Sequence, residues 1–131
     1  MSSIPAAPVT RANEPAAQNE ADLAHAIVDI LEDRQASDIV LMDLRAVSLL
    51  ADYFIIASAD NLRQMQALID TTSETLQKQG IRPLRVEGKP DSGWVILDYG
   101  SVIAHLFDPE SRAFYKLEQL WKNAPVILRM Q

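Results

Sequence analysis

Residues 80–121, GIRPLRVEGKPDSGWVILDYGSVIAHLFDPESRAFYKLEQLW, carry most of the local structural signals in this chain. Residues 94–99 and 102–107 are two apolar runs separated by Gly100 and Ser101. Because glycine adopts the positive φ of a tight turn at little cost, this spacing predicts an antiparallel hairpin. Just upstream, residues 84–87 alternate between apolar and charged side chains, which predicts a half-buried strand.

A helix is predicted to follow the hairpin. Asp108 is a suitable N-cap, and Pro109 fits the first helical position, where its missing N–H costs nothing. The helix is expected to extend to about Asn123 and to pack on the sheet through Ala113, Phe114, Leu117, Leu120 and Trp121. Tyr115 lies outside this stripe, and the pattern favours neither burial nor exposure for it.

The first half of the chain alternates between helical and strand patterns. Expected there are a helix over 20–35 capped by Asn19, strands over 39–44 and 53–58, and a helix over 61–79 capped by Asp60. Their apolar stripes are Leu23, Ile27, Ile30 and Leu31 in the first helix and Leu62, Met65, Leu68, Ile69 and Leu76 in the second. Together with the hairpin, these elements predict a single α/β (α+β) domain with a mixed sheet of about five strands, covered by helices.

Composition sets the broad class. The chain has 131 residues, is 48% hydrophobic and contains no cysteine, which fits one soluble intracellular domain without disulfides or thiolate metal sites. Its longest apolar run is too short to span a membrane. Residues 1–18 hold few aliphatic side chains and several prolines, so we expect a disordered N-terminal tail. The folded domain is expected over 19–124, with a C-terminal tail over 125–131.

The formal charge of −6 is concentrated near the N-terminus. Residues 14–43 contain eight acids and one base, and most of these acids fall on the first predicted helix. Two interpretations stay open, a solvated helix face or an electrostatic surface for a basic partner. Basic residues are scattered singly along the chain, so no nucleic-acid-binding stripe is indicated and direct DNA binding is not expected.

Several segments resemble one protein family. PLRVEG, WVILDYG, VIAHLF and RAFYKLEQLW, together with the upstream DIVLMDL and ADYFIIASADNLRQMQAL, resemble the Iojap-like family, the ribosomal silencing factors or RsfS, over residues 22–121. The resemblance implies a fold related to the nucleotidyltransferase superfamily but without its catalytic motif. It also implies a cytoplasmic homodimer that binds the large ribosomal subunit through ribosomal protein uL-fourteen. By blocking the joining of the small subunit, such a protein represses translation when nutrients are scarce.

A nucleotide-handling enzyme is the alternative that this fold relation raises. Nucleotidyl transfer needs a Gly-Ser turn followed, after a helix, by two carboxylates one residue apart on a strand that bind Mg²⁺. Gly100-Ser101 precedes Asp108 and Glu110 here, but the six residues between them have a strand pattern. The histidines at 25 and 105 lie far apart, and no zinc spacing is present. We therefore expect no catalytic residue, metal or cofactor.

The partner-binding surface is expected in the C-terminal half. The resemblance is densest there, and from Leu44 onward ten acids meet ten bases, so recognition would depend on specific pairs and aromatic anchors. Trp94 and Tyr115 are the candidate anchors, although a core position for Trp94 stays open. His105 is either a structural histidine or part of the surface. The candidate residues are Glu87, Lys89, Trp94, Asp98, His105, Arg112, Tyr115 and Glu118.

Overall fold

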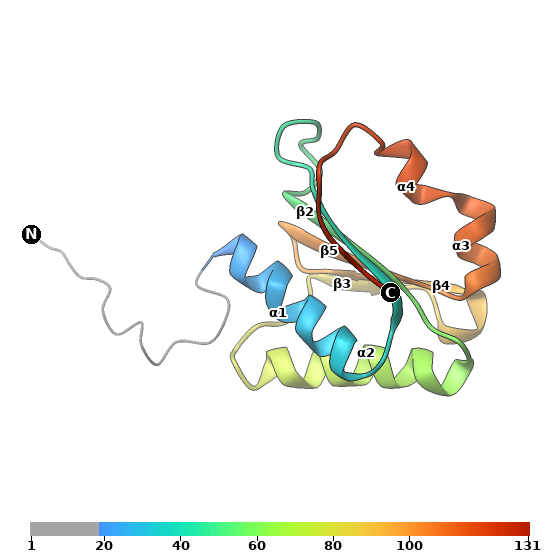
Figure 1. The fold of residues 1–131 in the computed structure, drawn as a ribbon. Helices are drawn as coiled ribbons and strands as arrows, with labels where there is room; N and C mark the ends of the chain where they lie inside the picture. The colour runs from blue at the N-terminus through green and yellow to red at the C-terminus, as the bar shows by residue number, and fades with distance from the viewer. Residues whose placement is uncertain (1–18) are drawn as a thin grey trace, which may run out of the picture.

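Residues 19–131 are described by the computed structural model, shown in Figure 1, and the expected N-terminal tail lies outside them. The described residues form α1 (Glu20–Asp33), β1 (Ser37–Asp43), β2 (Tyr53–Ser58), α2 (Leu62–Gln77), β3 (Arg85–Glu87), β4 (Trp94–Asp98), β5 (Val102–Phe107), α3 (Pro109–Tyr115), α4 (Leu117–Leu120) and β6 (Val126–Met130), with a short 3-10 turn at Pro90–Ser92.

One mixed sheet organises these elements, in the order β3-β4-β5-β2-β1-β6. The predicted hairpin is confirmed, because β4 and β5 pair antiparallel with Trp94 opposite Phe107 and Asp98 opposite Ile103. Strands β2 and β5 run parallel, whereas the other neighbouring strands of the sheet run antiparallel. The parallel pair is possible because the chain between β2 and β5, which forms α2, β3 and β4, is long enough to return to the same end of the sheet. The mixed α/β fold is as expected, and the sheet has six strands where the sequence predicted about five.

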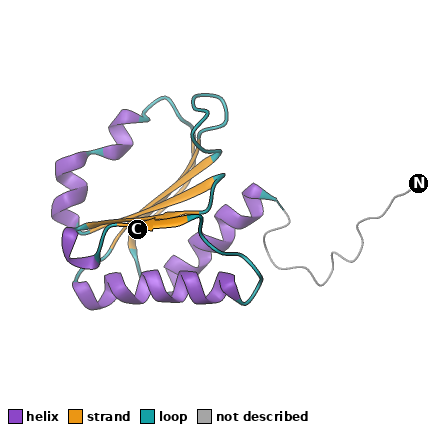
Figure 2. Cartoon of the chain, turned by 180° about the vertical axis from the view of Figure 1, so that it is seen from behind, coloured by secondary structure: helices purple, strands orange, loops and turns teal. Residues whose placement is uncertain are grey.

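Helices α1 and α2 cover one face of the sheet (Figures 1 and 2). Asn19 caps α1 as predicted, its side chain accepting a hydrogen bond of 2.9 Å from the Asp22 N–H. The predicted cap of α2 is wrong by one residue, because Asn61 rather than Asp60 accepts from the Gln64 N–H at 2.8 Å. The main core forms between these helices and the sheet, with Leu23, Ile27, Leu31, Ile55, Met65, Leu68, Leu76, Val95, Leu97 and Leu106 all buried.

The last predicted helix is interrupted. Lys116 adopts a left-handed conformation with φ 50°, which ends α3 and changes the direction of the chain before α4. Apolar residues on the two segments therefore do not form one continuous stripe. The prediction that Phe114 and Leu120 pack on the sheet is wrong, since they are 76% and 74% exposed, and Ala113 is exposed as well. Only the predicted contacts of Leu117 and Trp121 with the core are confirmed.

Strand β3 lies at one edge of the sheet, and its side chains are more exposed than the alternation predicted. Leu84, just before the strand, and Val86 within it are both exposed. The physical reason is position, because within the described residues this three-residue strand lies at the edge of the sheet and pairs only with β4.

Strand β6 forms the other edge and corrects the expected C-terminal tail at 125–131. It pairs antiparallel with β1, with Leu128 opposite Leu41 and Met130 opposite Ile39. The side chains of Leu128 and Met130 pack against the main core. A five-residue strand at the end of the chain has too little sequence to reveal its partner, so only the tertiary structure shows that it is ordered.

Truncation after Pro125 should therefore lower the free energy of unfolding by about 2 kcal/mol, because it removes two partly buried aliphatic side chains and exposes the edge of β1. The urea midpoint of the truncated chain measures this loss. Removal of Gln131 alone is the control and should leave the midpoint unchanged. An unchanged midpoint after the longer truncation would show that the C-terminal segment contributes nothing to stability.

Candidate partner-binding surface

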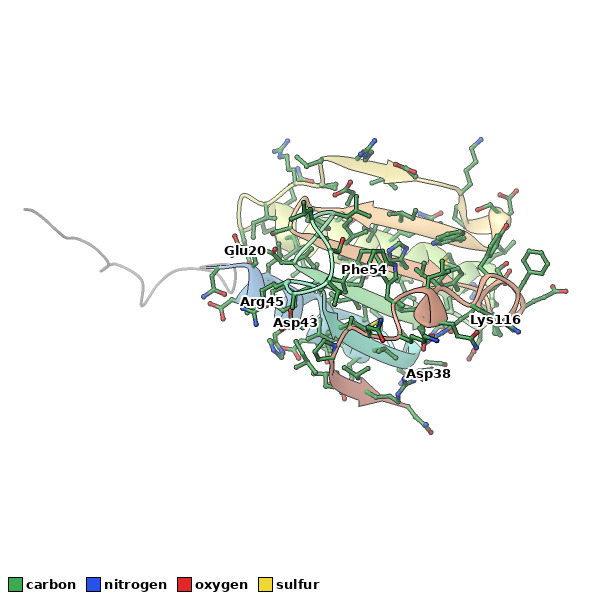
Figure 3. All side chains as sticks on the ribbon, turned by 90° about the horizontal axis from the view of Figure 1, so that it is seen from above. Glu20, Asp38, Asp43, Arg45, Phe54 and Lys116 are labelled. Atoms are coloured by element: carbon green, nitrogen blue, oxygen red, sulfur yellow. The ribbon has the colours of Figure 1, made fainter. Side chains whose placement is uncertain are left out.

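The face of the sheet opposite α1 and α2 is only partly covered. Figure 3 views this face from above, with α3 and α4 (orange-red) at one end of the sheet and the yellow strand β3 uncovered. Directly paired residues on neighbouring strands share a face. Arg85 pairs with Asp98, Glu87 with Ile96, and Ile96 with His105, so all of them belong to it. We call the accessible part the open face, defined by Arg85, Glu87, Trp94, Ile96, Asp98 and Ile103.

Charges of both signs lie beside the apolar centre of the open face, toward β3. Arg85 Nε lies 3.2 Å from Asp98 Oδ2 and 3.3 Å from Glu87 Oε2. The Asp98 carboxylate also accepts a hydrogen bond of 2.8 Å from the Gly100 N–H, which fixes it at the hairpin turn. Half-buried Ile96 and Ile103 lie between these charges and the aromatic side chains. An apolar centre with a polar rim is the usual anatomy of a protein-binding surface.

Six of the eight aromatic residues gather beside the open face. The rings of Trp94 lie 4.9 Å from Phe107 and 4.8 Å from Tyr115, measured between centroids. Phe114 contacts Tyr115 edge-on at 5.0 Å. We call this the aromatic cluster; its members are Phe54, Trp94, Phe107, Phe114, Tyr115 and Trp121, and His105 lies between Trp94 and Phe54. Tyr115 is 49% exposed, which decides the question left open by its helical position.

Trp94 is held in place by the loop that precedes it. Gly93 has φ 85°, and a Cβ atom at this position would collide with Ser111 Oγ at the start of α3. The Gly93 carbonyl accepts a hydrogen bond of 2.9 Å from the Asp108 N–H. Asp108 is the N-cap of α3, as predicted, and accepts from the Ser111 N–H at 2.7 Å. The loop before Trp94 and the helix that carries Tyr115 are therefore locked together, which brings the two rings into contact.

His105 lies beneath this surface rather than on it. Its side chain is 5% exposed, and its Nδ1 accepts a hydrogen bond of 3.2 Å from the Trp94 indole N–H. Burial lowers the pKa of His105 from 6.5 to about 4, although the negative charge of Asp98 acts in the opposite direction. The imidazole is consequently neutral at neutral pH. Direct partner contact, one of the two roles predicted for His105, does not fit this burial.

The depressed pKa of His105 predicts acid sensitivity. When the pH falls from 6.5 to about 4, the unfolded chain binds a proton at His105 and the folded chain does not, so the free energy of unfolding falls. The loss should approach ~3 kcal/mol at the lower end of this range, given 1.36 kcal/mol per pKa unit. Urea midpoints of the wild type and His105→Leu between pH 7 and pH 4 measure the difference. A His25→Gln variant, changed at an exposed position on α1, is the control, and identical curves for wild type and His105→Leu would contradict the prediction.

Arg112 and Glu118 do not join the open face. The Arg112 side chain is 10% exposed and donates to the Asp38 carbonyl at 2.7 Å and to Ser58 Oγ at 2.9 Å. Its Nε donates to Glu118 Oε2 at 2.9 Å. The network ties α3 and α4 to the ends of β1 and β2, and Arg129 of β6 adds a contact of 3.4 Å to Asp38. Arg112 and Glu118 thus stabilise the fold through this network, and their role as partner contacts stays a prediction.

Of the predicted site residues, the structure brings Glu87, Trp94, Asp98 and Tyr115 together, with His105 below them. Lys89 is exposed in the loop after β3. Arg85, Ile96 and Ile103 also belong to this surface, and the buried rings of Phe54 and Phe107 lie beneath it; none of the five was predicted as a site residue. The signal that could have found four of them is the period-two alternation along the three strands around the hairpin, which assigns them to the face of Trp94.

The described residues contain no group of three or more His, Asp or Glu side chains placed to hold a metal ion. Gly100-Ser101 and the Asp108–Glu110 carboxylates lie at opposite ends of β5, so the structure does not assemble them. Within residues 19–131 no helix is long and apolar enough to cross a membrane. The described residues thus form a small α/β domain with a partly apolar surface flanked by charged side chains.

Comparison with known proteins identifies the family. Residues 17–131 match the profile described as "Ribosomal silencing factor during starvation", and the chain belongs to this family. A ribosomal silencing factor RsfS from Halalkalibacterium halodurans is 35% identical over 106 residues, covering 81% of this chain and 91% of that protein. A mouse protein named "Mitochondrial assembly of ribosomal large subunit protein 1" is 31% identical over 98 residues, which cover 72% of this chain and 43% of that protein. A crystal structure of a Chromobacterium violaceum protein superposes on this chain with a TM-score of 0.76 at 28% sequence identity. The superposition covers 80% of this chain and 88% of that protein.

Proposed function

We propose that this chain binds the large ribosomal subunit through ribosomal protein uL-fourteen and thereby prevents the small subunit from joining. Translation would then be repressed when nutrients are limiting. The protein acts as a ribosome-associated regulator in the cytoplasm, and it forms a homodimer. Membership of the ribosomal silencing factor family supports the ribosomal part of this proposal. The large-subunit target is supported by the name of the mouse relative.

The observation that carries the proposal is the open face with Trp94 and Tyr115 at its edge. Aromatic side chains that are only partly buried and lie beside an apolar centre are typical hot spots of protein interfaces. The neighbouring Arg85, Glu87 and Asp98 supply charges of both signs for specific pairing with a protein. A block of this kind requires no chemistry, only tight docking and enough bulk to collide with the other subunit.

Charge favours one orientation on the ribosome. Helix α1 carries the five acids Glu20, Asp22, Asp29, Glu32 and Asp33 and no lysine or arginine. It covers the sheet face opposite the open face (Figure 1). Ribosomal RNA is a polyanion that repels an acidic surface. Docking through the open face directs α1 away from the large subunit, so of the two interpretations of these acids the proposal favours a solvated helix face.

The order of addition tests the mechanism. The protein should inhibit translation when it is added to separated subunits, and it should inhibit much less when the subunits are already joined, because the docking surface is then covered. Co-sedimentation with purified large subunits and a pull-down with isolated uL-fourteen measure the binding step directly. Equal inhibition under both orders of addition would rule out a block of subunit joining, and absence of binding to the isolated protein would rule out uL-fourteen as the target.

A further inference from the structure

Among the described residues, one polar contact fixes the orientation of the Trp94 ring. Its indole N–H donates to His105 Nδ1 at 3.2 Å, and the two rings are 5.9 Å apart between centroids. Phe107 and Tyr115 contact the indole through their rings. Ring contacts of this kind tolerate sliding and tilting, whereas a hydrogen bond to a ring nitrogen requires one edge of the indole to face one point. His105 therefore decides which edge of Trp94 is buried and which is presented to solvent.

His105 is an unusual residue for its position. It interrupts the otherwise apolar sequence VIAHLF of β5, and it lies between Phe54 and Trp94 in the aromatic cluster. A neutral histidine that accepts at Nδ1 carries its proton on Nε2. Within residues 19–131 the buried Nε2 atom has no hydrogen-bond partner. A buried donor without an acceptor lowers the stability of the folded state.

His105 thus has two opposing effects. Its unpaired Nε2–H lowers the stability of the fold, whereas its Nδ1 atom orients the Trp94 ring. An aliphatic side chain at position 105 would continue the apolar strand and would leave no unpaired donor. It would also remove the acceptor that the indole N–H has within residues 19–131. Because burial keeps His105 neutral above about pH 4, the Nδ1 lone pair is available throughout the physiological range.

We propose that His105 is a positioning residue that orients the Trp94 indole for docking on the partner protein, and that the imidazole is retained at the expense of monomer stability. The inference rests on the proposed function, because it concerns how the anchor of the open face is presented. His105 does not contact the partner. Its contribution is to restrict the rotation of Trp94 before binding, so that less conformational entropy is lost when the complex forms.

Two substitutions separate this role from a structural one. His105→Leu removes the acceptor and keeps an apolar side chain of similar size, whereas His105→Asn retains an acceptor oxygen close to the position of Nδ1. We expect His105→Leu to bind large subunits about three- to tenfold more weakly, with an unchanged or higher urea midpoint at pH 7. His105→Asn should regain most of the affinity. The indole N–H signal of Trp94 in a ¹⁵N–¹H spectrum should shift in His105→Leu and stay close to its wild-type position in His105→Asn.

A double-mutant cycle with Trp94→Phe completes the test. Phenylalanine has no N–H, so His105→Leu should cause no further loss of affinity in that background. Unchanged binding of His105→Leu, equal weakness of the Leu and Asn variants, or an additive loss in the cycle would each overturn the proposal. A His105→Leu variant that loses affinity only in proportion to a lower urea midpoint would show a structural role instead.

Different results would contradict the proposed function and the positioning role of His105. If the wild-type protein does not bind large subunits, the proposed function fails and the docking role of His105 fails with it. The contact itself is still tested by the indole signal, since an unshifted signal in His105→Leu would show that the histidine does not orient the ring. If the wild type binds and His105→Leu binds equally well, the proposed function stands and only the positioning role is overturned.

Discussion

Replacing Tyr115 or Trp94 by alanine should weaken binding to the large ribosomal subunit by roughly thirtyfold or more, equivalent to about 2 kcal/mol. The two rings are 4.8 Å apart and lie at the edge of the open face. Burying such rings in an interface removes a large apolar area from water, and the Tyr115 hydroxyl offers a hydrogen bond to the partner. The loss in the double variant should be smaller than the sum of the single losses, because the rings contact each other.

The two variants should differ in stability. Tyr115 is 49% exposed, so its truncation should change the urea midpoint little. Trp94 also packs on Phe107 at 4.9 Å, and its truncation should lower the free energy of unfolding by ~1–2 kcal/mol. Equilibrium binding and urea midpoints, measured on the same preparations, separate docking from folding.

Leu62→Ala is the matched control for these variants. Leu62 is an exposed apolar residue at the start of α2, which covers the opposite face of the sheet. The control removes a similar type of surface and should bind large subunits as the wild type does. Wild-type binding by both Tyr115→Ala and Trp94→Ala would exclude the open face as the docking surface.

Replacing Arg112 by methionine should lower the free energy of unfolding by about 3 kcal/mol, the largest stability loss that we expect from a single surface-proximal charge. The guanidinium group is almost fully buried and satisfies the Asp38 carbonyl, Ser58 Oγ and the Glu118 carboxylate. Methionine fills the space of the aliphatic stem but leaves these acceptors without their donor. Ser58 is itself buried, so its hydroxyl has no easy access to water.

Arg45→Met is the control for this prediction. Arg45 also forms a two-pronged pair with a carboxylate, with Nε and Nη2 lying 3.0 and 2.8 Å from the oxygens of Asp43. Its side chain is 61% exposed, compared with 10% for Arg112. Exposed pairs contribute up to about 1 kcal/mol, because solvent screens them. Similar urea midpoints for the two variants would contradict the structural role assigned to Arg112.

Local sequence determined most of the secondary structure. Strand β2 was predicted at its observed limits, and the β4–β5 hairpin follows from two apolar runs around Gly100. The N-caps Asn19 and Asp108 were found because a capping side chain bonds only two or three residues ahead. Such features are encoded within a few residues, so a short window of sequence is sufficient to recognise them.

Tertiary structure decided which surfaces are exposed. The helical pattern of 109–123 predicted burial of Phe114, but the left-handed backbone at Lys116 breaks the helix and leaves that ring in solvent. The C-terminal residues form β6 only because the edge of β1, more than eighty residues earlier in the chain, is free to pair with them. The periodicity of a short sequence window predicts neither the backbone conformation at a single residue nor the pairing of strands that are far apart in the chain.

For the candidate site, too, some features could be predicted from the sequence and others depend on the tertiary structure. Sequence alone named Trp94, Asp98, His105 and Tyr115 as a possible surface, because they lie in the segments that resemble the family. Only the packed sheet shows that Trp94 and Tyr115 are in contact and that His105 lies beneath them. It also shows that the buried Arg112 side chain belongs to a separate network of hydrogen bonds and ion pairs. The physical reason is that residue type and spacing determine the local conformation and chemistry of a side chain, whereas its exposure and its partners depend on which distant elements pack around it.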